Sequence, residues 1–314
     1  MNYPLRGPKP IACYLGACGD ETINLQSASG GVVSQIILNH LSTGGIVITP
    51  QFDPSVLRFR ITQIQRPEDY IVAASVYHDV GLVDALKAFE IDAKLSYLLT
   101  CLPCEASFAK NFFKKKGAHA IIIALACSGQ QHYDATSTLF KMSGLDVCNI
   151  TDFKYRGDGW PSGVQVRLNN GQVRNFPNLK GLWYNIFNSQ LFTLEKCFTC
   201  TDVLGKNADI VCADPWLPEY MNHEREGVSH TLVFVRRPID PLLFKGISLQ
   251  DIDTKRAILS QKYTIDRKER QLSHKSIVYL FLRSRHYLAL VLTTNSILLT
   301  SFRILYSKFW KLIP

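Results

Sequence analysis

A β–α–β unit at residues 94–127 is the segment that most limits how this chain can fold. The segment reads in order as a buried strand, a turn, a helix and a second buried strand, over residues 94–100, 101–105, 106–116 and 119–126. Two strands joined in this way lie parallel, and a right-handed crossover brings their C-terminal ends to one edge of the sheet. Cys104 and Cys127 each follow such an end. We therefore expect these two cysteines to be neighbours in space.

The rest of the sequence predicts an α/β fold with a mixed sheet flanked by helices. An Asn170-Gly171 turn indicates a β-hairpin. Other strands are indicated at residues 44–50, 57–64, 146–150 and 208–212. Two of these strands contain Cys148 and Cys212, which we interpret as buried small hydrophobic residues.

Helices are predicted between these strands and in the last part of the chain. One begins near Gly30, where Ser27 and Ser29 are suitable caps, and its apolar residues recur at helical spacing up to Leu41. Two more are predicted at residues 80–91 and 182–194.

Composition indicates a folded protein of the cytoplasm. Of the 314 residues, 46% are hydrophobic and only 19% are charged, which is ample for a packed core. The N-terminal sequence MNYPLRGPKP is too polar and too rich in proline for a secretory signal. We therefore expect the cysteines to serve as thiols or metal ligands rather than as disulfides.

The positive charge of the chain is confined to its C-terminal tail. Residues 255–314 hold 12 of the 35 Lys and Arg and 2 of the 26 acids, so the preceding residues hold 23 against 24. A basic groove for nucleic acid is therefore not indicated in the body of the protein. The tail is also apolar, and its longest uncharged stretch, residues 287–302, is shorter than the roughly 20 residues that span a membrane. We expect tail helices packed on the body, with peripheral membrane contact as the alternative.

Cys197 and Cys200 form a Cys-x-x-Cys pair, followed by Asp202 and Asp214. This spacing lets one loop present two thiolates to one metal centre. A zinc site and a redox-active dithiol fit the same pair.

Two glycine-containing segments suggest places for an anionic ligand. Gly30 and Gly31 precede a helix, where backbone N–H groups can bind a phosphate, although such glycines also occur without a ligand. Arg156, Gly157 and Trp160 lie in a second loop that could surround a flat anion or serve as a simple turn.

The order of seven motifs resembles one known family. The motifs are SASGGVVS, CLPCE, ACSG, KYRGDGWPSG, CFTCTD, ADIVCADPW and GVSHTLVFVR, the last from Gly227 to Arg236. Together they resemble the coenzyme F420 hydrogenase/dehydrogenase beta-subunit family over roughly residues 10–245. The resemblance implies an oxidoreductase that holds FAD beside a [4Fe-4S] cluster.

The resemblance also implies roles for individual residues. Four cysteines match the core cysteines of the family and become candidate cluster ligands: Cys104, Cys127, Cys197 and Cys200. Six residues match the two flavin loops: Ser29, Gly30, Gly31, Arg156, Gly157 and Trp160. Asp202 and Asp214 match acids that we expect to make structural or flavin-side hydrogen bonds. No catalytic acid or base is assigned.

On this resemblance, electrons pass through FAD between the cluster and a hydride carrier, coenzyme F420, or an organic substrate. Other members act in tetrapyrrole reduction or are linked to polysaccharide synthesis. We expect a ferredoxin or a partner subunit to exchange the electrons, because an N-terminal ferredoxin-like cysteine run is reduced here to Cys13 and Cys18. The competing hypothesis is a non-catalytic binding module with a zinc site, in which Cys101 joins Cys104 and the Cys197/Cys200 pair.

These expectations divide the chain into three parts. They are an N-terminal portion with the flavin loop, a cluster- and flavin-binding domain, and a basic, apolar helical tail, at residues 1–92, 93–250 and 251–314.

Overall fold

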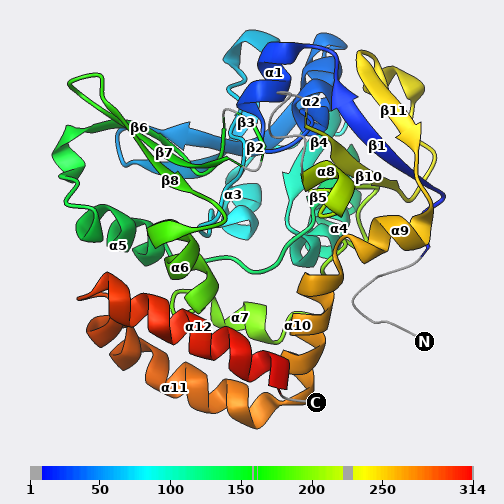
Figure 1. The fold of residues 1–314 in the computed structure, drawn as a ribbon. Helices are drawn as coiled ribbons and strands as arrows, with labels where there is room; N and C mark the ends of the chain where they lie inside the picture. The colour runs from blue at the N-terminus through cyan, green and yellow to red at the C-terminus, as the bar shows by residue number, and fades with distance from the viewer. Residues whose placement is uncertain (1–8, 158, 161, 222–228, 313–314) are drawn as a thin grey trace.

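A computed structural model describes residues 9–157, 159–160, 162–221 and 229–312. Its main element is a mixed sheet, shown in Figure 1, with the strand order β11-β1-β10-β9-β5-β4-β2-β3. In chain order these strands are β1 (Ala12–Cys18), β2 (Ile46–Asp53), β3 (Arg58–Ile64), β4 (Ser96–Cys101), β5 (His119–Leu125), β9 (Ile210–Ala213), β10 (Thr231–Val235) and β11 (Ile247–Asp251). Strands β2, β4, β5 and β9 are parallel, and the other pairs are antiparallel. The predicted α/β fold with a mixed sheet is confirmed.

A smaller antiparallel sheet lies beside the main one. It contains β6 (Ile150–Lys154), β7 (Gly163–Leu168) and β8 (Val173–Pro177). The hairpin between β7 and β8 is the predicted one, and Gly171 adopts a φ of 81° at its turn. A left-handed backbone of this kind costs glycine little, which is why the Asn-Gly pair predicts the turn.

Helices cover the sheets and form the C-terminal part of the chain. They are α1 (Glu21–Gln26), α2 (Val32–Ser42), α3 (Leu82–Ala88), α4 (Ala106–Lys116), α5 (Asp134–Met142), α6 (Gly181–Ser189), α7 (Glu195–Phe198), α8 (Pro218–Met221), α9 (Thr254–Leu259), α10 (Lys262–Ser273), α11 (Lys275–Leu292) and α12 (Ser296–Leu312). Short 3₁₀ turns are η2 (Pro67–Asp69), η3 (Pro103–Glu105), η4 (Val147–Asn149) and η6 (Pro241–Phe244).

Both faces of the main sheet are buried. Leu99 of β4 packs in one core with Phe113 of α4, whereas its neighbour Leu98 packs in another core with Ile36 of α2. Successive side chains of a strand point to opposite faces, so a strand covered on both faces is a continuous apolar run. A third core joins the small sheet to α6 and α12 through Phe153, Trp183 and Leu299.

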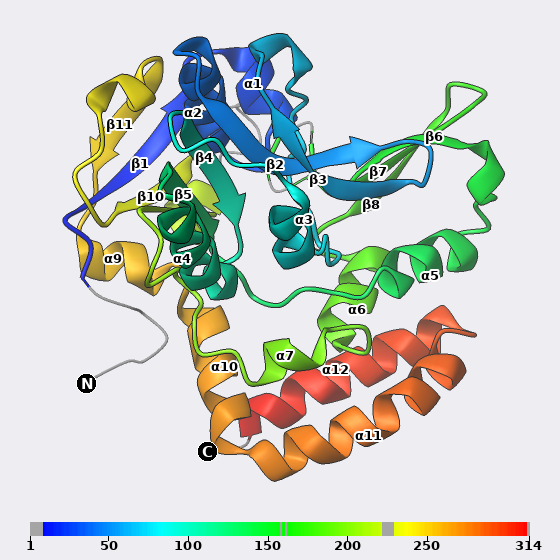
Figure 2. The same ribbon diagram turned by 180° about the vertical axis from the view of Figure 1, so that it is seen from behind.

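The tail helices pack on the body, as expected. Figures 1 and 2 show α12 beside α6 and α11 further out. Leu299 of α12 is buried, and the side chain of Asn185 donates a hydrogen bond to Thr300 at 2.8 Å. Trp310 and Val278 pack against Phe198 of α7. Within the described ranges, no helix is long and apolar enough to cross a membrane.

Three local predictions are wrong. The predicted strand 146–150 begins only at Ile150, and Val147–Asn149 form η4 instead, because the Asp146 carboxylate accepts the backbone N–H of Cys148 and stabilises a turn that leaves Cys148 exposed. No serine caps α2, since Gly31 is its N-cap residue and Ser27 ends α1 instead. The predicted helix 182–194 ends at Ser189, because Gln190 turns left-handed with a φ of 58°.

Candidate functional site

Four cysteines come together where β4 and β5 end. Cys104 lies in η3 after β4, Cys127 follows β5, and Cys197 lies in α7, three residues before Cys200. The thiols of Cys104 and Cys200 share a hydrogen bond, and the Cys127 thiol interacts electrostatically with the other three. The structure therefore brings together Cys104 and Cys127, as the β–α–β unit predicts.

We call Cys104, Cys127, Cys197 and Cys200 the four-cysteine site. Their pKa values depend on burial and on a proton shared between two sulfurs. The hydrogen bond between Cys104 and Cys200 raises the pKa of Cys104 and lowers that of Cys200, because the pair holds one proton between two sulfurs. Burial raises the pKa of Cys127 to about 12 and also raises the pKa of Cys197. The Lys268 ammonium opposes the rise at Cys127 and Cys197. A cation beside buried thiols favours the thiolates that bind metals.

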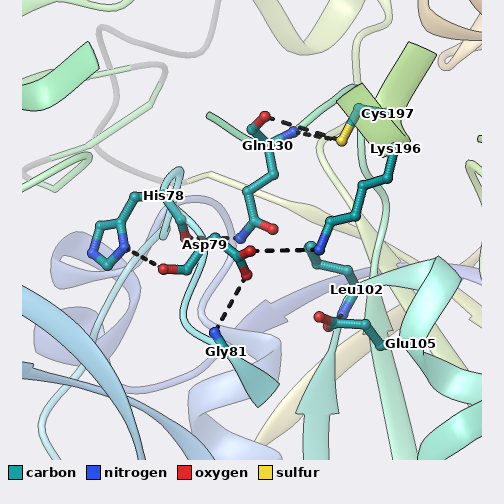
Figure 3. Close-up of polar contacts among 8 residues, drawn as sticks. All are labelled: His78, Asp79, Gly81, Leu102, Glu105, Gln130, Lys196 and Cys197. Atoms are coloured by element: carbon teal, nitrogen blue, oxygen red, sulfur yellow. Dashed lines mark hydrogen bonds and ion pairs between the residues drawn. The ribbon is translucent and has the colours of Figure 1, made fainter. Parts of the chain in front are cut away.

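Figure 3 shows how the loop after β5 holds Cys197. The backbone N–H of Gln130 lies 3.4 Å from the Cys197 sulfur. The Gln130 side chain donates to the carbonyl oxygen of His78 at 2.7 Å, and Lys196 pairs with Asp79 at 3.5 Å. These contacts tie the Cys-x-x-Cys segment to two other loops.

The turn around Cys104 is held separately. The Glu105 carboxylate accepts the backbone N–H of Leu102 at 2.9 Å, which closes η3 (Figure 3). Cys101, in contrast, is buried in the main-sheet core, and burial is the largest cause of its raised pKa. The charges that act on Cys101 belong to Glu105, Asp202 and Asp209. In the part of the chain that the structure describes, no group of three or more His, Cys, Asp or Glu side chains is placed so that it could hold a metal ion.

A cavity of about 510 Å³ lies next to the four-cysteine site. Its volume is typical of small-molecule sites. Residues from several parts of the chain line it, including Ser29, Gly31, Cys127, Arg156, Asp214 and Arg267. Cys127 thus belongs both to the four-cysteine site and to the cavity wall.

Arg156 connects two other parts of the cavity wall and also contacts Trp160. Its guanidinium donates to the Asp214 carboxylate at 2.7 Å and to the carbonyl oxygen of Ala28, next to Ser29. It also lies 4.8 Å from the centre of the Trp160 ring. Burial raises the pKa of Asp214, and the charge of Arg156 opposes that rise. The Arg156–Asp214 pair therefore places a compensated ion pair at the cavity.

Several polar atoms of the cavity wall lack a partner. Among the described residues, Arg156 Nε, Arg267 Nε and Gln130 Oε1 are buried and make no hydrogen bond. All three residues line the cavity. The three atoms themselves have almost no accessible surface, so a ligand in the cavity would contact other atoms of these side chains.

Other predicted residues have structural contacts instead. A Cβ atom at Gly30 would lie 2.4 Å from the carbonyl oxygen of Gly16, so Gly30 permits close packing of the backbone and does not line the cavity. Asp202 caps the turn after Cys200 by accepting the Lys206 N–H at 3.1 Å. The Gly157 N–H donates to Ser162 at 3.1 Å.

Trp160 packs against Trp216, with ring centres 4.8 Å apart. Asp158, Pro161, Gly227 and Val228, which the sequence motifs include, lie outside the described residues.

Sequence reasoning missed the contribution of α10. Lys268 donates to the Cys197 carbonyl oxygen at 2.6 Å, and Arg267 donates to that of Ser128. Tyr263 and Thr264 also line the cavity. The basic run that contains these residues was visible in the sequence, but nothing in it indicated burial.

Comparisons with known proteins agree with this architecture. The family model for the C terminus of the coenzyme F420 hydrogenase/dehydrogenase beta subunit matches residues 95–255, which is just over half of the chain. No curated protein matches the sequence.

One solved structure with the same fold is a chain of the F420-reducing [NiFe] hydrogenase complex from Methanosarcina barkeri, studied by xenon derivatisation. It superimposes with a TM-score of 0.61 at 16% identity, covering 87% of this chain and 94% of that chain. The residues that match the family model include the four-cysteine site and the Arg156–Asp214 pair. This chain therefore belongs to the coenzyme F420 hydrogenase/dehydrogenase beta-subunit family.

Proposed function

We propose that this protein is an oxidoreductase that uses FAD and a [4Fe-4S] cluster to pass electrons between the cluster and a hydride carrier such as coenzyme F420, or an organic substrate. The observation that carries the proposal is the position of Cys127. Its thiol interacts with those of Cys104, Cys197 and Cys200, and the same residue lines the cavity. A cluster on the thiols and a flavin in the cavity would then be adjacent.

The chemical character of these side chains suits the two groups. Four thiols can each bind a different iron of a cluster. A flavin exchanges two electrons as a hydride with one partner and single electrons with an iron–sulfur centre. We assign the cluster to Cys104, Cys127, Cys197 and Cys200, and the flavin to the cavity.

Within the cavity, the protein itself provides charge and position. Arg156 and Arg267 line the cavity, and their guanidinium groups suit the phosphates or the electron-rich ring edge of a flavin. Ser29 and Gly31 lie in the wall at the start of α2, where the helix dipole favours an anion. Asp214 holds Arg156 in place.

An electron partner would approach near Cys104. This cysteine is exposed, whereas Cys197 is buried. The similar chain from Methanosarcina barkeri is part of a hydrogenase complex. We therefore propose that a ferredoxin or a partner subunit exchanges electrons with this protein at the surface around η3.

The test is cofactor analysis of protein purified and reconstituted without oxygen. We expect bound flavin and about four iron atoms per chain. Cys197→Ser should lose most of the iron and keep the flavin, because Cys197 does not line the cavity. Cys148→Ser is the matched control, since that cysteine is exposed in η4, and it should keep both.

Full iron content in Cys197→Ser would reject the ligand assignment. Zinc without flavin in the wild-type protein would reject the redox function and favour a binding module. Neither result depends on knowing the substrate. Once flavin and iron are present, oxidation of reduced F420 with a ferredoxin as acceptor tests the hydride carrier.

A further inference from the structure

Helices α11 and α12 form an antiparallel hairpin on the outside of the molecule. They lie side by side, joined by residues 293–295, and the end of α12 returns to the start of α11 (Figures 1 and 2). The inner side of the hairpin packs on the body through Val278, Leu299 and Trp310. The outer side has no partner among the described residues.

The outer side is apolar near the connecting loop. Tyr287 and Leu290 are both 73% exposed, and Ile297 is 72% exposed. Val291 and Leu298 beside them are exposed as well. No charged residue occurs between positions 287 and 302. We call the exposed apolar residues 287, 290, 291, 297 and 298 the hairpin tip.

The apolar stripe continues along α12. Ile304, Leu305, Phe309 and Leu312 are exposed and follow the tip at helical spacing, so they share one face with Ile297 and Leu298. An exposed apolar surface of this kind marks a binding surface.

Cations gather at the opposite end of the hairpin. Because the helices are antiparallel, the start of α11 and the end of α12 lie together, and these two ends carry the exposed Lys275, Lys308 and Lys311. Arg283 is exposed between this end and the tip. Residues 275–314 contain no Asp or Glu.

Two other arginines of the hairpin face inward. Arg285 is buried and donates to the carbonyl oxygen of Thr193, and Arg303 bonds to Asn185 at 3.1 Å. The hairpin is thus fastened to the body by one set of cations and exposes another.

We propose that the outer side of this hairpin docks on the surface of an anionic lipid bilayer. The tip would enter the boundary between headgroups and acyl chains, and the exposed lysines and Arg283 would contact lipid phosphates. Apolar residues with exposed cations and no acids are the pattern of helices that lie in a membrane interface. Exposed tyrosines such as Tyr279 and Tyr287 suit the same boundary.

The charge pattern favours lipid over a second copy of the chain. Two copies packed through this surface would bring their exposed cations together with no acid on the hairpin to pair with them. An anionic lipid surface supplies the missing negative charge everywhere along the hairpin. The inference is independent of the proposed redox chemistry, since it uses no cofactor.

Vesicle co-sedimentation of the full chain tests the proposal. Vesicles of phosphatidylcholine alone are compared with vesicles that contain 30% phosphatidylglycerol, at low and high salt. We expect at least tenfold tighter binding to the anionic vesicles and weaker binding at high salt. Leu290→Ser combined with Ile297→Ser should reduce binding at least tenfold, and so should Lys308→Ala combined with Lys311→Ala.

Leu242→Ser is the matched control. Leu242 is 65% exposed in η6, outside the hairpin, and its substitution should leave vesicle binding unchanged. Unfolding curves show that each variant is folded. Equal binding of wild type and the tip variant, or no binding to anionic vesicles, would overturn the proposal.

Sedimentation velocity separates the alternative occupants. A wild-type dimer that the tip variant converts to a monomer, without vesicle binding, would assign the surface to a second copy and also overturn the lipid proposal.

Discussion

Lys268 of α10 donates from its ammonium to the carbonyl oxygen of Cys197, over 2.6 Å. The lysine is only 3% exposed, and its charge opposes the rise in the pKa of the Cys197 thiol that burial causes. Lys268, a residue of the basic tail, therefore stabilises the Cys-x-x-Cys segment by a hydrogen bond and favours the Cys197 thiolate by its positive charge.

Lys268→Met should lower the free energy of unfolding by about 2 kcal/mol, because the Cys197 carbonyl oxygen is left buried without its donor. Iron content after reconstitution should fall as well, since the thiolates lose a neighbouring cation. Urea unfolding and iron analysis measure the two effects. Lys262→Met on the same helix is the control, because Lys262 is exposed and its ion pair with Asp266 contributes little. Equal losses in both variants would contradict the role of Lys268.

Arg156→Ala should lower the free energy of unfolding by about 3 kcal/mol, since it leaves Asp214 in the cavity wall without its cation. Flavin content should fall while iron content is retained. Arg156→Lys keeps the charge but cannot serve Asp214 and Ala28 at once, so it should recover only part of the loss. Arg174→Ala, at an exposed position of β8, should change neither quantity. Normal flavin content in Arg156→Ala would remove Arg156 from the cofactor site.

Gly30→Ala should destabilise the protein by about 3 kcal/mol even when no flavin is bound. The new Cβ would meet the backbone of Gly16 at 2.4 Å and of Thr231 at 2.8 Å, and backbone atoms of two strands cannot move aside cheaply. Gly157→Ala is the comparison, because its Cβ would be no closer than 3.6 Å to any neighbour. Urea unfolding midpoints of the two flavin-free variants measure the difference in stability. A stable Gly30→Ala protein with weakened flavin binding would show that Gly30 faces the ligand.

His78 should make stability depend on pH. Its Nε2 accepts the Phe59 N–H at 3.0 Å, so its Nδ1 carries the proton, and burial lowers its pKa below 6.5. Between the folded pKa and 6.5 the unfolded state binds more protons. The contribution of neutral His78 to the free energy of unfolding is therefore complete above pH 6.5 and is lost as the pH falls below 6.5.

The slope from one such proton is at most about 1.4 kcal/mol per pH unit. Urea midpoints at pH 7.5 and 5.5 should differ less in His78→Gln than in the wild type. His132→Gln, at an exposed position, should behave as the wild type. His40 is also buried with a lowered pKa, so part of the slope remains in every variant.

The parts of the fold that depend on local patterns could be predicted from the amino-acid sequence. Apolar runs and the handedness of the crossover predicted the β–α–β unit and hence the approach of Cys104 to Cys127. The Asn170-Gly171 pair predicted the turn of the hairpin, because its geometry requires a left-handed backbone. These signals lie within a few residues of the structure that they specify.

The contacts of the tail and of the glycines before α2 could not be predicted in this way. Nothing in the sequence indicated the contacts of Lys268 and Arg267, because the oxygens that accept their hydrogen bonds lie 71 and 139 residues away in the chain. From the sequence, Gly30 could belong to a phosphate site or have no ligand, and the structure shows that its missing side chain makes room for the backbone of Gly16. Burial and packing of this kind depend on contacts between distant segments, and residue type and local spacing do not encode those contacts.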